Sequence, residues 1–217
     1  MTTILTVDPR HFTLRSLQPA SRALLAGGVV GAATDSFYGL MALADQASAL
    51  GRLIDLKGQR GADDAFLLLV DSRERVKAYA QEIPPEAEKL MDAFWPGLLT
   101  ILLKAQSGLQ SAILGKNKST VGVRVDGFPV ARALVRLTDR AVTGTSANPR
   151  GLPPARDPET VIRYFGERVD LIVDTGPALG DKPSTVIDLS KAPFTIQREG
   201  AIGSAAIQKV LPEIGTA

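Results

Sequence analysis

The chain has 217 residues, of which 45% are hydrophobic and 22% charged, a balance typical of globular proteins that excludes fibrous and disordered chains. It contains no cysteine and one histidine, which excludes a disulfide framework, thiolate chemistry and the usual zinc sites, so no metal site is expected. The net charge of +2 arises from 25 basic and 23 acidic side chains, so any affinity for nucleotides or nucleic acids must come from local clustering of charge.

Short β-branched runs alternate with longer segments of helical spacing, which is the order of an α/β or mixed α+β domain. We expect a single domain over residues 1–217, with one large twisted mixed sheet flanked by helices. The expected strands are residues 4–7, 29–33, 66–70, 99–103, 121–125, 141–144, 171–173, 185–189 and 195–198. The expected helices are residues 18–26, 47–57, 73–80, 85–94, 130–137, 158–165 and 205–211. Pro85 and the pair Asp157-Pro158 mark helix starts.

The sequence lacks the common targeting and nucleotide-binding signatures. No apolar run approaches the roughly 20 residues of a membrane-spanning helix, and the N-terminus lacks the basic start and hydrophobic stretch of a secretory signal. We therefore expect a cytoplasmic protein without a membrane partner. There is no Walker-type loop, no G-x-G-x-x-G after a strand and no S-x-x-K, so a nucleotide site must be of another kind.

Hydroxyl and basic side chains occur instead at the ends of expected strands, where an open sheet forms a crevice. Segment 34–40 (TDSFYGL) follows a strand directly, and its polar groups suit either the ammonium and hydroxyl of an amino acid or a simple Ser/Thr turn. Segment 57–60 (KGQR) ends an amphipathic helix, where its cations suit either a triphosphate or the helix dipole. Each of these segments is weak evidence when taken alone.

Four further segments have the same character. In segment 118–125 (KSTVGVRV), strand alternation places Thr120, Gly122 and Arg124 on one face, and Arg124 suits a carboxylate or phosphate unless it lies on an edge strand. Segment 143–149 (TGTSANP) can present backbone and side-chain donors to an anion or satisfy itself. Ser184 and Arg198, in segments 182–188 (KPSTVID) and 197–202 (QREGAI), again supply a hydroxyl and a cation at strand ends.

Taken in order, these segments resemble the threonylcarbamoyl-adenylate synthases of the YrdC, Sua5 and YciO family over nearly the whole chain. The family patterns P-T-[ED]-[ST]-x-Y-G-L, W-P-G-x-L-T and S/T-V-G-x-R-x-P correspond to residues 33–40, 95–100 and 120–126. T-S-A-N is intact at residues 145–148, P-S-T-V-x-D at 183–188 and x-R-x-G-A-I at 197–202. It is the joint order of these motifs that makes the resemblance specific.

The resemblance implies a YrdC-like fold with a deep basic cavity in which ATP and L-threonine meet. In family members the threonine amine takes up carbon dioxide from bicarbonate, and the carbamate attacks the α-phosphate of ATP and releases pyrophosphate. A separate transferase then uses the threonylcarbamoyl-AMP to modify adenosine 37 of tRNA. The resemblance therefore implies a nucleotidyltransferase with ATP, L-threonine, bicarbonate and that transferase as partners, and it leaves open a contact with tRNA or double-stranded RNA.

The matching motifs also imply roles for individual residues. The residues that would hold the phosphates are Lys57, Arg60 and Arg198, of which Lys57 and Arg60 are taken as catalytic. The residues that would donate hydrogen bonds around the nucleotide are Ser119, Thr120, Ser146 and Asn148. The residues that would hold threonine are Thr34, Arg124, Thr145 and Ser184, with Arg124 on its carboxylate. Mg²⁺ would enter bound to ATP, with few protein ligands of its own.

Several positions depart from the family pattern, among them Ala33 in place of the first motif's proline and Asp64 where a lysine is common. Family members usually have K-x-R-P followed by P-L-x-x-H-V, whereas here Arg60 is displaced by one residue, Ala65 replaces a proline and Leu69 replaces the histidine. Asp126 stands in place of the proline of R-x-P. The run Phe66-Leu67-Leu68-Leu69 is more like the YciO branch. Two alternatives therefore stand beside a threonine-dependent synthase: a YciO-like paralogue that binds nucleotide without efficient synthesis, and an RNA-binding or ribosome-associated protein.

Overall fold

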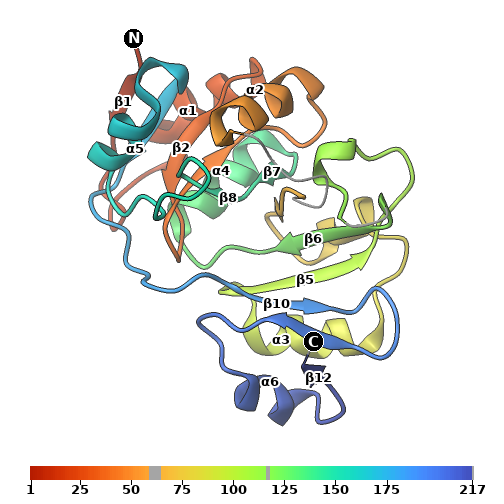
Figure 1. Ribbon diagram of the computed structural model, residues 1–217. Coiled ribbons are helices and arrows are strands. Elements are labelled where there is room, and N and C mark those ends of the chain that lie inside the picture. The colour runs from red at the N-terminus through yellow and green to blue at the C-terminus, as the bar shows by residue number, and fades with distance from the viewer. Residues whose placement is uncertain (59–64, 116–117, 217) are drawn as a thin grey trace.

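The computed structural model describes residues 1–58, 65–115 and 118–216 (Figure 1). Its α-helices within these ranges are α1 (Gln18–Leu25), α2 (Ala47–Lys57), α3 (Pro85–Phe94), α4 (Pro129–Thr138), α5 (Pro158–Phe165) and α6 (Ser204–Val210). None of the helices in the described ranges is both long and apolar enough to span a bilayer.

The helices begin where local signals place them. Asp157 caps α5, because its Oδ1 accepts a hydrogen bond of 2.6 Å from the backbone nitrogen of Thr160, and Pro158 takes the first helical position. The bounds of α2, α3 and α5 are those expected from the sequence. Residues 73–80 were expected to form an α-helix but contain instead the 3-10 helix η2 (Glu74–Ala78). Its hydrogen bonds join residues three apart, as in the bond of 2.9 Å from the Tyr79 nitrogen to the Val76 oxygen.

The strands form two mixed sheets. The five-stranded sheet has the order β1 (Thr3–Thr6), β9 (Leu171–Asp174), β2 (Val30–Ala33), β3 (Tyr38–Met41), β8 (Thr145–Ser146). The seven-stranded sheet has the order β12 (Gly215–Thr216), β11 (Thr195–Arg198), β10 (Thr185–Asp188), β5 (Leu99–Lys104), β6 (Thr120–Arg124), β4 (Leu68–Leu69), β7 (Val142–Thr143). The α/β class expected from the sequence is confirmed, but the single large sheet is corrected to two.

The division into two sheets occurs at Gly144. The chain leaves the seven-stranded sheet after β7 and enters the five-stranded sheet at β8, and an isolated bridge between Leu43 and Val142 joins the sheets at the same place. A Cβ on residue 144 would lie 2.8 Å from Cγ of Leu69, so only glycine allows the backbone to cross here without displacing that side chain. The short strands β3, β8 and β12 were not expected, because β3 and β8 lie within segments recognised only as polar loops.

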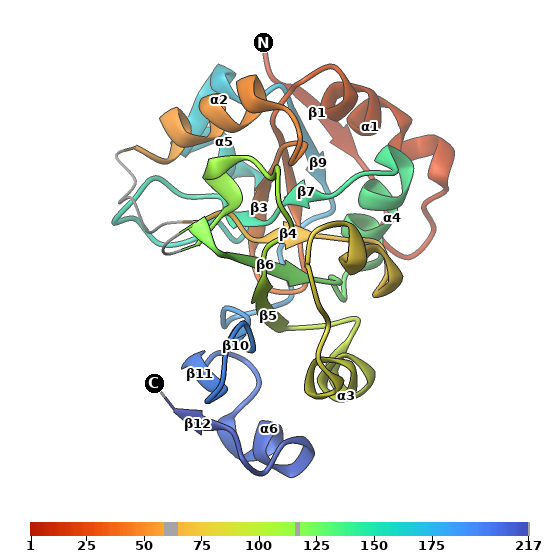
Figure 2. The same ribbon diagram turned by 90° about the vertical axis from the view of Figure 1, so that its right-hand side faces the viewer.

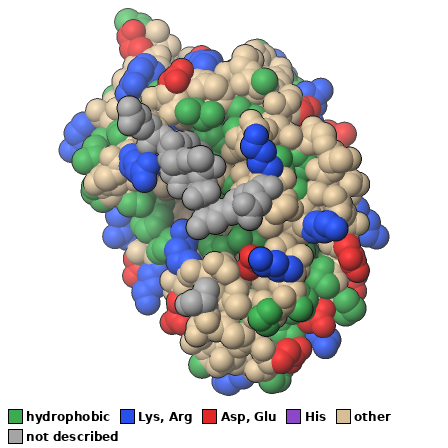
Figure 3. Space-filling model, turned by 45° about the vertical axis from the view of Figure 1, so that its right-hand side comes forward, with side chains coloured by type: hydrophobic (Ala, Val, Ile, Leu, Met, Phe, Trp, Pro, Cys, Tyr) green, Lys and Arg blue, Asp and Glu red, His purple; other side chains and the backbone are tan. Residues whose placement is uncertain are grey.

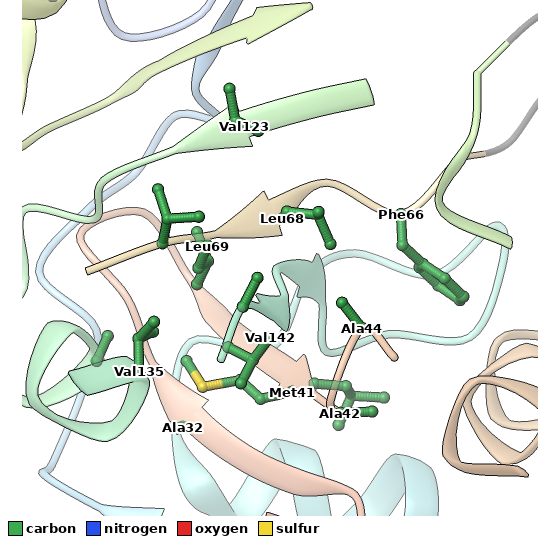
Figure 4. Packing of buried hydrophobic residues seen from close by; sticks show 14 of the residues in the cluster. Ala32, Met41, Ala42, Ala44, Phe66, Leu68, Leu69, Val123, Val135 and Val142 are labelled. Atoms are coloured by element: carbon green, nitrogen blue, oxygen red, sulfur yellow. The ribbon is translucent and has the colours of Figure 1, made fainter. Parts of the chain in front are cut away.

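The hydrophobic core continues from one sheet to the other. Figure 4 shows Leu68 and Leu69 of β4 between Val123 of β6 and the side chains of Met41 and Val142. In Figures 1 and 2, α1, α2, α4 and α5 gather around the five-stranded sheet, whereas α3 and α6, which contact each other, lie at the opposite end beside the seven-stranded sheet. The buried junction between the sheets therefore provides a rigid base for the site described next.

Candidate active site

A cavity of about 420 Å³ lies where the two sheets meet. The five-stranded sheet contributes β3, β8 and the loop before β3, and the seven-stranded sheet contributes β5, β6, β10 and β11. The Ser, Thr and Arg side chains of its lining are Thr34, Ser36, Thr100, Arg124, Thr145, Ser146, Ser184 and Arg198. Its volume suits a small molecule or a nucleotide rather than a macromolecule.

Six of the residues expected to bind ligand line this one cavity. They are Thr34, Arg124, Thr145, Ser146, Ser184 and Arg198. They come from positions as far apart in the chain as Thr34 and Arg198. The pairing of β3 with β8 brings segments 34–40 and 143–149 side by side. In that pairing Leu40 lies opposite Thr145 and Gly39 lies opposite Ser146.

Lys57 and Asn148 are not part of the cavity lining, but both contact Ser146, which is. Nζ of Lys57 donates hydrogen bonds to the backbone oxygen of Ser146, 2.7 Å, and to Oδ1 of Asn148, 3.0 Å. Oγ of Ser146 donates to the same Asn148 oxygen at 2.6 Å. The C-terminus of α2 thus supports the turn after β8, and the Lys57 charge is held next to a lining residue.

Three other expected ligand-binding residues have different placements. Ser119 directly precedes β6 and Thr120 is its first residue, and neither is part of the cavity lining. Strand alternation nevertheless keeps Thr120 on the same face as Gly122 and Arg124, which line the cavity. Arg60 lies outside the described residues. Leu69, at the position of the family's histidine, is fully buried beneath Gly144, and the lining at that point consists of Ala65, Leu67 and Gly144.

Arg124 is held between two carboxylates. It is only 3% exposed, and its Nη2 lies 3.3 Å from Oδ1 of Asp35 and forms a close ion pair with Oδ2 of Asp126. Its Nε is buried without a hydrogen-bond partner among the described residues, as is Oδ1 of Asp35. The site therefore contains a guanidinium and a carboxylate whose hydrogen-bonding capacity the protein leaves partly unused.

Burial raises the pKa of Asp35 to about 6, and the nearby Asp126 carboxylate adds to the rise while Arg124 opposes it. The charge at this end of the cavity therefore changes near neutral pH. Below about pH 6 the Asp35 carboxyl is protonated and the cavity is more positive; above it the two carboxylates together outweigh Arg124.

A second guanidinium stands on the other side of the cavity. Nη2 of Arg198 donates to the backbone oxygen of Ser184 at 2.8 Å, and Oγ of Ser184 shares a hydrogen bond of 2.9 Å with Oγ1 of Thr100. Burial and the positive charge of Arg124 lower the pKa of Arg198, although part of its side chain remains exposed to solvent. Two guanidinium groups close enough to repel each other favour an anionic ligand between them.

Sequence reasoning missed four polar residues of the site. Ser36 and Thr100 lie within quoted motifs and line the cavity, but neither was singled out. Asp35 was noted only as part of its segment, and Asp126 only as a replacement for proline. The available signal was the spacing of Asp126 two residues after Arg124, which is close enough for its carboxylate to pair with the guanidinium.

The cavity lining also includes apolar side chains, among them Phe37, Leu67, Leu102 and Val186. Apolar side chains that exclude water from a bound ligand, together with a few hydroxyl and guanidinium groups that orient it, are the usual composition of a small-molecule site. Within the described ranges, no cluster of three or more His, Cys, Asp or Glu side chains could hold a metal ion.

The model of the Sua5/YciO/YrdC family, described as "Telomere recombination", matches residues 22–200. The chain belongs to this family. The resemblance inferred from the motifs is thus confirmed, and the matched residues include the whole cavity lining. Threonylcarbamoyl-AMP synthase from Pyrococcus abyssi is 35% identical over 188 residues, which cover 87% of this chain and 55% of that protein.

Two solved structures of family members resemble the chain closely. Sua5 from P. abyssi, solved in complex with L-threonine, has a TM-score of 0.94 and 32% identity, and the match covers 100% of this chain and 63% of that chain. YciO from E. coli has a TM-score of 0.86 and 28% identity, covering 95% of this chain and 100% of that chain. The chain therefore spans less than two thirds of the archaeal protein and the whole of the YciO chain.

Proposed function

We propose that the protein is an L-threonylcarbamoyladenylate synthase, which forms threonylcarbamoyl-AMP and pyrophosphate from L-threonine, bicarbonate and ATP. One observation carries the proposal: two guanidinium groups and six Ser or Thr side chains line a single cavity. The reaction joins two anionic reactants, so positive charge and oriented hydrogen-bond donors are what it requires. The name of the P. abyssi relative and the threonine complex of Sua5 support this assignment.

In the proposed reaction the threonine amine attacks carbon dioxide derived from bicarbonate and loses a proton, which forms the carbamate. A carbamate oxygen then attacks the α-phosphate of ATP, and the bond to the pyrophosphate breaks as the new P–O bond forms. Arg124 would bind the threonine carboxylate, while Thr34, Thr145 and Ser184 orient the amino acid. Arg198, with Lys57 and Arg60, would bind the phosphates, and Ser119, Thr120, Ser146 and Asn148 would donate hydrogen bonds around the nucleotide.

Mg²⁺ belongs to this proposal as part of the ATP substrate. A magnesium ion bound through phosphate oxygens needs few protein ligands, which fits a cavity whose lining supplies hydroxyl groups and cations. The product would pass to a tRNA-modifying transferase, and the proposal places the protein in the cytoplasm, where ATP, threonine and tRNA are available.

Pyrophosphate release tests the proposed function directly. Purified protein is mixed with ATP, Mg²⁺ and bicarbonate, with and without L-threonine, and pyrophosphate is measured. Release that depends on both threonine and bicarbonate supports the synthase, whereas nucleotide binding without release would assign the chain to the YciO-like alternative.

The RNA-binding alternative predicts a different result, namely RNA retention that falls steeply with salt and no effect of threonine. On the face shown in Figure 3, Lys and Arg side chains are scattered among Asp and Glu rather than gathered into one basic stripe. A phosphate backbone needs such a stripe, so this face does not favour the alternative.

A further inference from the structure

Asp126 uses both of its carboxylate oxygens at the end of β6. Its side chain is 1% exposed, and Oδ1 accepts hydrogen bonds from the backbone nitrogens of Phe128, 2.8 Å, and Asp35, 3.1 Å. Its Oδ2 pairs with Nη2 of Arg124. A single buried carboxylate thus connects the loop after β6, the loop before β3 and the cavity arginine.

Asp35 makes the reciprocal connection. Its Oδ2 accepts a hydrogen bond of 2.9 Å from the backbone nitrogen of Gly127, and its Oδ1 approaches Nη2 of Arg124. A Cβ on residue 127 would lie 2.9 Å from that Oδ2, so glycine at this position allows the close approach of the two loops. Arg124 therefore lies between two carboxylates, of which Asp126 accepts from the backbone of Asp35 and Phe128 and Asp35 accepts from the backbone of Gly127.

Both carboxylates face the same nitrogen of Arg124: Asp126 pairs with Nη2, and Oδ1 of Asp35 lies 3.3 Å from it. A carboxylate that pairs freely with a guanidinium tends to take two of its N–H groups at once, in a bidentate arrangement. Here neither carboxylate does so, because each has another oxygen tied to backbone N–H groups. Nε of Arg124 consequently remains without a hydrogen-bond partner among the described residues, although the side chain lines the cavity.

We infer that Asp126 is a positioning residue for the amino-acid carboxylate: it holds Nη2 of Arg124 so that the rest of the guanidinium is kept for the ligand. The inference rests on the proposed function, in which L-threonine is that ligand. Without the negative charge of Asp126, Asp35 can turn to bind Arg124 in bidentate fashion and compete with the substrate. Asp126 touches no substrate itself and acts through Arg124.

The Asp126→Asn variant removes the charge but keeps an oxygen for the backbone N–H groups of Asp35 and Phe128. Asp170→Asn is its matched control, because Oδ2 of Asp170 also accepts a backbone hydrogen bond, from Val29 at 2.7 Å, and pairs with an arginine, Arg52 at 2.8 Å. Asp170 lies beside the five-stranded sheet and is not part of the cavity lining.

The readout is discrimination between L-threonine and L-threoninamide, which lacks the carboxylate, measured by calorimetry in the presence of a non-hydrolysable ATP analogue. In Asp126→Asn we expect the preference for L-threonine to fall about 10-fold and KM for threonine to rise by a similar factor, with kcat changed less than about 3-fold. Asp170→Asn keeps the wild-type preference. Asp126→Glu, which restores the charge, recovers part of it.

A preference for L-threonine that survives in Asp126→Asn overturns the inference and leaves the proposed function intact. A wild-type protein that binds neither compound overturns both. Should the Asn variant not fold, Asp126→Ser, whose hydroxyl can still accept a backbone hydrogen bond, must show the same loss of discrimination; unchanged discrimination in the Ser variant overturns the inference equally.

Discussion

Two walls of the cavity differ in whether their buried polar groups have hydrogen-bond partners within the protein. On the hydroxyl wall, formed by Thr34 and Ser36 before β3 and by Ser146 of β8, the hydroxyl groups bond within the protein. Oγ1 of Thr34 donates to the Phe37 oxygen at 2.7 Å and lies 3.0 Å from Oγ of Ser36, and Oγ of Ser146 donates to Asn148. On the charged wall, where Asp35 of the loop before β3 faces Arg124 and Asp126 at the end of β6, Nε of Arg124 and Oδ1 of Asp35 are buried without hydrogen-bond partners among the described residues.

This difference indicates what each wall contributes. Hydroxyl groups that already have protein partners keep their positions without a ligand, so they provide shape and orientation. A buried charge with unused hydrogen-bonding capacity lowers stability until a partner arrives, so the charged wall provides affinity. Substitutions on the charged wall should therefore have large effects, and those on the hydroxyl wall small ones.

Arg124→Ala should give the largest effect. We expect KM for threonine to rise about 100-fold, because a buried charge-assisted pair with the substrate carboxylate is lost, while the affinity for ATP changes much less. Pyrophosphate release at varied threonine and calorimetry with an ATP analogue measure the two quantities. The exposed Arg136→Ala serves as the control for loss of an arginine, and equal losses of threonine and ATP affinity in Arg124→Ala would contradict the roles given to this wall.

Asp35→Asn should change the pH dependence of stability. A carboxyl whose pKa is raised from 3.8 to about 6 on folding binds its proton more tightly in the folded state. Its contribution to stability is therefore present below about pH 4 and is lost as the pH rises through 6. Between pH 4 and pH 7.5 the wild-type free energy of unfolding should fall, relative to the variant, by about 2 kcal/mol.

Urea unfolding of the wild type and Asp35→Asn at several pH values measures this difference. Parallel curves of unfolding free energy against pH for the two proteins between pH 4 and pH 7.5 would show that the pKa of Asp35 is not raised on folding. The comparison between proteins cancels the contributions of other carboxyl groups, such as Asp157, whose pKa is lowered chiefly by its hydrogen bond to Thr160.

Arg198→Ala should weaken ATP use about 10-fold and leave KM for threonine nearly unchanged, because its guanidinium is partly solvated and shares the phosphates with other cations. Steady-state kinetics with ATP varied at saturating threonine measures the effect. A larger rise in KM for threonine than for ATP would place the amino acid on the Arg198 side of the cavity and reverse the proposed orientation of the substrates.

Ser36→Ala should have the smallest effect. It removes the hydrogen bond to Thr34 from the hydroxyl wall, so the free energy of unfolding should fall by about 1 kcal/mol and KM for threonine should change less than about 3-fold. Thermal unfolding and pyrophosphate release measure both. A loss as large as that of Arg124→Ala would erase the distinction between the two walls.

Local patterns in the sequence were enough to locate the helices and the site motifs. Pro85 and Pro158 favour the first helical turn through their fixed φ, and Asp157 caps α5 by accepting from the Thr160 nitrogen; these effects act within one turn and do not depend on the rest of the fold. The order of the motifs identified the family, and six of the residues that the motifs singled out line one cavity. Strand alternation likewise placed Gly122 and Arg124 on one face.

The division into two sheets and the setting of Arg124 depend instead on contacts between residues distant in the chain. Gly144 allows the crossing between sheets only because Leu69, from another strand, packs against it. In the sequence, Asp126 is recognised only as a replacement for a proline. Its hydrogen bond to the backbone of Asp35 forms across 91 residues of sequence and is seen only in the folded chain. Pairings of this kind are set by packing across the whole domain, so no short window of residues contains them.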